Sequence, residues 1–230
     1  RDPASSEGLK SLVDGLPQDD KHRIHLVKLD LEDQSSIVAA ANEIRSKVDR
    51  VDMLLNVAGL LGDGKTTAGP ERSITKMERD WLEKTFSVNV FGPVMLSKEL
   101  VPLMAQNRRG KNDASSASRP NSVIVNLSAR VGSISDNNLG GWYSYRMSKA
   151  ALNQATRTMA LELKRQSIWC IALHPGTTDT DLSKPFQKNV AEGRLFPVEF
   201  TVDSLFKVVN AMEDEHSGGL FDWAGKAIPF

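Results

Sequence analysis

The stretch SVIVNLSARVGSISDNNLGGWYSYRMSKAALNQ, residues 122–154, decides the fold class. It begins with an apolar run typical of a strand that is buried on both faces of a sheet. A polar loop rich in Gly, Ser and Asn follows, and then a strongly periodic helix predicted over 145–164. The same order of short apolar strand and helix recurs along the chain. The sequence therefore predicts an α/β domain with a mostly parallel sheet.

The flanking sequence extends this pattern in both directions. No repeat or linker interrupts it, so residues 1–230 are expected to form a single domain. Strands are predicted over 25–30, 53–57, 122–127, 169–174 and 219–223, and helices over 35–48, 76–104, 145–164 and 201–212. Asp33 or Ser35 is the expected cap of the first of these helices. Residues 60–70 and 108–120 have the composition of loops, and 185–199 that of a lid or substrate loop.

Composition excludes several classes of protein. Lys plus Arg and Asp plus Glu both number 29, so the net charge is zero and offers no basic patch for nucleic acid or membrane. No apolar run approaches the ~18–20 residues that cross a bilayer. The single cysteine, Cys170, lies in an apolar run and is expected to be a buried thiol in a reducing, cytoplasmic protein. The start at Arg1 favours a fragment, which leaves a targeting segment open.

The most specific indication of chemistry in the sequence is the pair Tyr145 and Lys149. Their spacing of i, i+4 places both side chains on one face of a helix. A phenol has an ordinary pKa of about 10, and a neighbouring ammonium stabilises the phenolate and lowers that pKa. The spacing also occurs by chance in many helices, so by itself it leaves a purely structural role open.

Other motifs place this pair in context. They are NVAG at 56–59, SVNVFGP at 87–93, HPGTTDTDL at 174–182 and the ending GGLFDWAGKAIPF at 218–230. In this order they resemble the short-chain dehydrogenase/reductase family, in its carbonyl reductase subgroup of sniffer-like and C-factor-like proteins. The resemblance implies a three-layer, doubly wound Rossmann-type fold. It also implies NAD(P)H-dependent reduction of a small-molecule aldehyde or ketone, with no metal.

The resemblance implies a role for each matching catalytic residue. Tyr145 would be the general acid that protonates the carbonyl oxygen. Lys149 would lower the pKa of Tyr145 and hold the nicotinamide ribose. Asn89 would hold a water of the proton relay through a kink in its helix. A mid-helix Asn turned to solvent is the alternative.

It also implies a cofactor site. Asn56, Ala58 and Gly59 would form the turn beneath the adenosine ribose, unless they only end a strand. Asp30, with Leu31 beside it, would bind the adenine end, and a helix cap is the alternative for Asp30. Pro175, Gly176, Thr178 and Thr180 would contact the nicotinamide carboxamide.

The sequence departs from the family pattern at two places. Ala129 stands where the family carries its catalytic Ser, which leaves Ser128, then Ser133, as candidates. Strand alternation turns Ser128 away from the site unless the strand end bulges.

The first strand and the glycine-rich phosphate turn are also missing from the sequence. Arg1 would then follow the second strand and pair with the 2′-phosphate of NADP, which favours NADPH over NADH. An exposed terminal Arg is the alternative.

Two rival functions remain open at this point. A C-factor-like regulatory or signalling protein would bind the nucleotide with little turnover, and a scaffold would bind none. A homodimer is an open expectation.

Overall fold

The computed structural model describes residues 3–62, 70–105 and 120–230. In this part of the chain the main sheet has five strands in the order β1-β2-β3-β6-β7. Strands β1 (Met53–Asn56), β2 (Ser122–Leu127), β3 (Ile168–His174) and β6 (Leu220–Asp222) are parallel, and β7 (Ala227–Ile228) pairs antiparallel with β6. Strands β4 (Thr177–Thr178) and β5 (Leu195–Phe196) form a separate parallel pair. The predicted α/β class with a mostly parallel sheet is confirmed.

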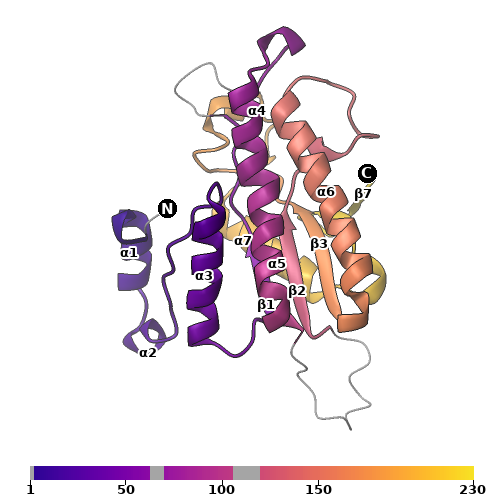
Figure 1. The fold of residues 1–230 in the computed structure, drawn as a ribbon. Helices are drawn as coiled ribbons and strands as arrows, with labels where there is room; N and C mark the ends of the chain where they lie inside the picture. Colours follow the sequence, from indigo (N-terminus) through magenta and orange to yellow (C-terminus); the bar gives the residue numbers. More distant parts are fainter. Residues whose placement is uncertain (1–2, 63–69, 106–119) are drawn as a thin grey trace.

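Helices cover both faces of the sheet. Figure 1 shows α3 (Gln34–Lys47), α5 (Gly92–Met104) and α6 (Tyr143–Leu163) side by side in front of the strands, with α7 (Val198–Asn210) behind. The front layer buries a core that includes Leu100, Met104 and Leu163 against Ile124 and Cys170. On the other face, Val209 packs against Val125, Ile171 and Leu173. Apolar strands buried on both faces give the predicted three layers.

Most predicted elements agree with the structure to within three residues at each end. Asp33 caps α3, because its Oδ1 accepts the Ser35 N–H at 2.8 Å. The predicted lid, 185–199, contains most of a 3₁₀ segment (Lys184–Asn189), then β5 and the start of α7. Cys170 is fully buried, and burial raises the pKa of its thiol to about 12.

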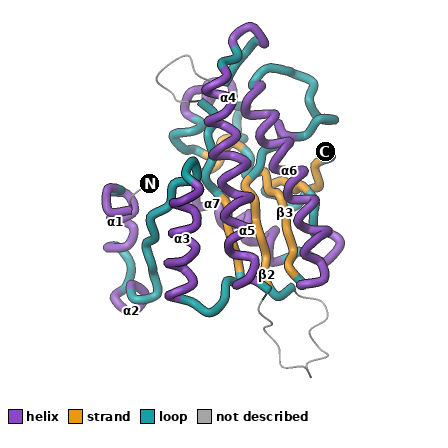
Figure 2. Tube along the Cα trace, viewed as in Figure 1, coloured by secondary structure: helices purple, strands orange, loops and turns teal. Residues whose placement is uncertain are grey.

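The strand predicted over 25–30 is wrong. After α1 (Glu7–Asp14) and α2 (Gln18–Lys21), the chain runs through 24–30 without strand geometry (Figure 2). Alternating apolar residues favour an extended backbone, but a strand also needs a neighbour to complete its ladder of hydrogen bonds. No strand of the described residues pairs with this segment.

The single helix predicted over 76–104 is also corrected. The segment consists of a 3₁₀ turn (Ile74–Lys76), α4 (Arg79–Phe86), a π-helical turn (Ser87–Phe91) and then α5. Insertions of this kind accommodate an extra residue in a helix and are frequent at functional sites. The predicted mid-helix Asn89 lies inside the π-helical turn.

Candidate active site

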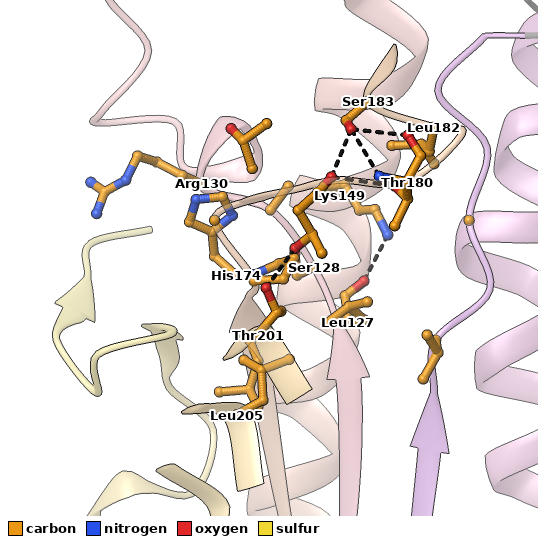
Figure 3. Close-up of a pocket in the computed structure, with 18 of the residues that line it drawn as sticks. Leu127, Ser128, Arg130, Lys149, His174, Thr180, Leu182, Ser183, Thr201 and Leu205 are labelled. Carbon is orange, nitrogen blue, oxygen red and sulfur yellow. Dashed lines mark hydrogen bonds between the residues drawn. The ribbon is translucent and has the colours of Figure 1, made fainter. Parts of the chain in front are cut away.

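A cavity of about 680 Å³ opens at the carboxyl ends of β1, β2 and β3, beside the N-terminal half of α6 (Figure 3). This is the edge at which open α/β sheets bind ligands. The cavity volume lies within the range of ~300–1,000 Å³ typical of small-molecule sites. Its lining is mainly apolar, and the predicted site residues that contribute to it are Asn56, Gly59, Ser128, Tyr145, Lys149, Pro175, Gly176, Thr178 and Thr180.

A buried chain of amides fixes the strands beneath the cavity. Asn56 Nδ2 donates to Asn126 Oδ1 at 2.8 Å, and Asn126 Nδ2 donates to Thr156 Oγ1 at 2.8 Å. Asn56 Nδ2 also lies 3.4 Å from Ser97 Oγ on α5. These bonds join β1, β2, α5 and α6, so Asn56 has a structural role at the cavity floor.

Tyr145 and Lys149 lie together on α6, as their spacing predicts. Their exposed fractions are 9% and 3%, and Lys149 Nζ lies 5.6 Å from the centroid of the Tyr145 ring. Nζ donates a hydrogen bond of 2.7 Å to the backbone oxygen of Leu127 at the end of β2. Burial lowers the pKa of Lys149 to about 8. An ammonium has three N–H donors, so two remain for a ligand.

The expected lowering of the Tyr145 pKa is not what this structure shows. Burial raises the pKa of the Tyr145 phenol to about 12. In a dry site the loss of hydration disfavours the phenolate, and the nearby Lys149 ammonium donates to the Leu127 carbonyl. The Tyr145 hydroxyl therefore keeps its proton at neutral pH and is suited to donate it.

Asn89 holds the loop after β1 against α6. Its Oδ1 accepts the Leu60 N–H at 2.7 Å, and its Nδ2 donates to Leu60 O at 2.8 Å and to Ser148 Oγ at 3.0 Å. The side chain is completely buried, which rules out the alternative of an Asn turned to solvent. Its part in a proton relay stays a prediction.

Ser128 and Ala129 follow the end of β2 and have different partners. Ser128 borders the cavity, but its Oγ donates to Asn153 Oδ1 on α6 at 2.6 Å. Ala129 also borders the cavity and packs against Tyr145. Ser133 lies outside the cavity lining and accepts the Asp136 N–H at 3.1 Å. A catalytic role for Ser128 stays a prediction, and its hydroxyl already has a structural partner.

Glycines allow a close approach of neighbouring groups at two points of the cavity. A Cβ on Gly59 would lie 3.5 Å from both Asn89 Oδ1 and Lys149 Nζ, so the backbone at Gly59 lies close to the ammonium. Gly176 has a φ of +74°, and its Cβ position is occupied by the Phe196 ring, 2.6 Å away. The two available donors of Lys149, with Gly59 close to them, fit the ribose of a nicotinamide.

The adenine-end residues lie apart from this cavity. The Asp30 carboxylate accepts the Glu32 N–H at 3.0 Å, and Leu31 packs under Gly92 at the start of α5. Neither lines the cavity, and Ala58 is exposed beside it. Arg1 lies outside the described residues.

Within 3–62, 70–105 and 120–230, no cluster of His, Cys, Asp or Glu could hold a metal, and no helix is long and apolar enough to cross a membrane.

An aromatic wall that was not predicted from the sequence lies beside Tyr145. Trp142, in the left-handed conformation with φ 55° and ψ 43°, places its ring centroid 6.4 Å from that of Tyr145 and 5.4 Å from that of Phe186. Leu61 completes this apolar surface. The pair Gly140-Gly141 before a bulky residue at a helix start was the available signal.

Comparisons with known proteins agree with this geometry. A model of the short chain dehydrogenase family matches residues 4–191. C-signal of Myxococcus xanthus is 29% identical over 180 residues, which cover 78% of this chain and 93% of C-signal. Two crystal structures match the whole chain. The NADPH-bound carbonyl reductase from chicken fatty liver is 28% identical, with a TM-score of 0.81 and 85% of its chain covered. Carbonyl reductase Sniffer of D. melanogaster is 25% identical, with a TM-score of 0.83 and 86% covered.

Proposed function

The chain belongs to the short-chain dehydrogenase family, an oxidoreductase family, and from this premise we propose that it reduces an aldehyde or ketone to an alcohol with NADPH. The observation that carries the proposal is the buried pair of Tyr145 and Lys149 at the cavity. The NADPH-bound state of the chicken carbonyl reductase supports the choice of cofactor. Pairing of Arg1 with the 2′-phosphate would add to this preference.

Tyr145 would act as the general acid. When bound, NADPH supplies the hydride that adds to the carbonyl carbon and is itself oxidised to NADP⁺. Tyr145 Oη donates its proton to the carbonyl oxygen as negative charge develops there. The carbonyl thus gains a hydride and a proton, and the phenol becomes a phenolate.

Lys149 and the cavity wall would support this proton transfer. The Lys149 ammonium stabilises the phenolate that Tyr145 leaves, and its two remaining N–H groups would hold the nicotinamide ribose. Gly59, Pro175, Gly176, Thr178 and Thr180 would surround the nicotinamide end. The apolar side chains of Trp142, Phe186 and Leu61 exclude water, which strengthens electrostatic interactions inside the site.

The test is the substitution Tyr145→Phe in the full-length protein. It removes only the hydroxyl, so turnover should fall by roughly 10²–10⁴-fold while the Kd for NADPH stays nearly unchanged. Turnover is followed as NADPH oxidation with a panel of aldehydes and ketones. Tyr143→Phe is the matched control, because Tyr143 is in the same helical turn but outside the cavity lining. A Tyr145→Phe rate above about a tenth of wild type would remove Tyr145 as the acid.

Ala129 favours one alternative function. With Ala129 at the cavity, the hydroxyl that the family pattern places there is absent. This fits a nucleotide-binding signalling role with little turnover. The two functions differ in one result, because a signalling protein would bind NADPH but oxidise it with no member of the carbonyl panel.

A further inference from the structure

Helix α6, which carries Tyr145 and Lys149, begins without a cap from its own sequence. The N-cap residue Trp142 makes no side-chain hydrogen bond to the first turn. Its left-handed backbone follows two glycines that also have positive φ, Gly140 and Gly141. A helix start leaves its first N–H groups without partners inside the helix, and in a buried setting another group must accept them.

Glu71 supplies these acceptors from a distant loop. Its backbone oxygen accepts the Trp142 N–H, and its carboxylate accepts the Ser144 N–H at 3.2 Å. The other carboxylate oxygen accepts the Ser144 hydroxyl. Glu71 is only 4% exposed and Ser144 only 1%, so these bonds are shielded from water. A carboxylate is also favoured at the positive end of a helix dipole.

The same helical turn builds the reactive side of the cavity. Trp142 lies two residues before Ser144 and Tyr145 directly follows it, and the rings of Trp142 and Tyr145 make an edge contact at the cavity wall. Arg146 holds the turn from its other side, with Nε donating to Gly141 O at 3.0 Å. Lys149 has its own anchor at Leu127, so it does not depend on this first turn.

We propose that Glu71 is a positioning residue for Tyr145. Its carboxylate and carbonyl fix the first turn of α6, and that turn holds the Tyr145 hydroxyl and the Trp142 ring at the cavity. The proposal rests on the proposed function, because it assigns Glu71 to the geometry of the proton transfer. It predicts that the loss of Glu71 impairs catalysis while cofactor binding at Lys149 is retained.

Two substitutions separate geometry from charge. Glu71→Ala removes the carboxylate that accepts both Ser144 bonds but keeps the backbone oxygen that accepts the Trp142 N–H. It should lower kcat by roughly 10–100-fold, because displacing a reacting group by about 1 Å can cost about 10²-fold. The Kd for NADPH should stay within about threefold, because the bond from Lys149 to Leu127 is untouched. Glu71→Gln keeps an oxygen for the Ser144 N–H and an NH₂ for its hydroxyl, so it should retain more than about half of kcat.

The matched control is Glu99→Ala, which removes a carboxylate that bonds Arg45 between α3 and α5. It should lower stability with little effect on kcat. The combined variant Glu71→Ala/Tyr145→Phe should be no slower than Tyr145→Phe alone, since residues that act through one group are not additive. The proposal fails if Glu71→Ala keeps the kcat of the control, or if Glu71→Gln is as slow as Glu71→Ala.

A spectroscopic test does not depend on turnover. The protein contains four Trp residues, and ¹⁹F NMR of the 5-fluorotryptophan-labelled protein reports on each. Trp142→Phe assigns the Trp142 signal. In Glu71→Ala this signal should shift or broaden, while that of Trp169, at the other end of β3 from the cavity, stays in place. An unchanged Trp142 signal would overturn the proposal. If the wild type reduces no carbonyl, the proposed function fails, and this measurement still decides whether Glu71 sets the turn.

Discussion

The replacement of Lys149 by Met should raise the free energy of unfolding at pH 7 and abolish most of the activity. Burial lowers the pKa of Lys149 from 10.5 to about 8. At about 1.36 kcal/mol for each tenfold change in proton affinity, the charged form costs the folded protein about 3 kcal/mol at pH 7. Met has a similar unbranched shape without the charge and removes this cost. In the variant the Leu127 carbonyl loses its hydrogen-bond donor, which lowers the free energy of unfolding by about 1–3 kcal/mol. The net effect at pH 7 is a gain of roughly 1 kcal/mol.

The pH dependence tests this reasoning more sharply than the single value. Between pH 8 and 10.5 the unfolded chain binds a proton at Lys149 that the folded protein lacks, so wild-type stability rises with pH there. The advantage of Lys149→Met should therefore shrink across this window. Above about pH 9 the variant should become less stable than wild type, because the cost of the buried charge has by then fallen below that of the lost hydrogen bond.

Urea denaturation of both proteins from pH 7 to 10.5 measures this difference. Lys98→Met is the control, since it replaces a helical lysine whose side chain is 66% exposed instead of buried. A constant difference between Lys149→Met and wild type would refute the argument. In the full-length protein the same variant should lose both turnover and affinity for NADPH, and a loss of turnover alone would leave the ribose contact unsupported.

Two further substitutions test the cavity wall. Gly176→Ala should destabilise the protein by clearly more than the ~1 kcal/mol expected for Gly193→Ala. Both glycines have φ near +74°, but only the Gly176 Cβ would meet a ring, that of Phe196; equal denaturation midpoints for the two variants would contradict the close approach. Ser128→Ala should cost about 1 kcal/mol of stability, because Ser128 bonds Asn153, and less than about tenfold in kcat. A loss near 10²-fold in steady-state assays would instead place the Ser128 hydroxyl on the substrate oxygen.

The sequence by itself was sufficient for the elements whose signal is local. The apolar runs of β1, β2 and β3 and the periodic helix α6 are written in consecutive residues, and the structure contains them. The pair Tyr145 and Lys149 shares a helix face for the same reason, because a spacing of four residues fixes direction wherever the helix lies. Asn89 was also marked by its unusual place within a helical pattern.

Other features depend on groups that are distant in sequence and meet only in the folded chain. Residues 24–30 are not a strand, because a strand is completed by a neighbour that local alternation cannot supply. The pKa of Tyr145 rises instead of falling, because its ring is buried in a cluster with Leu61 and Trp142 and burial disfavours the phenolate. The cap of α6 comes from Glu71, 73 residues before Ser144. Desolvation and long-range hydrogen bonds depend on which surfaces come into contact on folding. A local pattern of residue types does not predict those contacts.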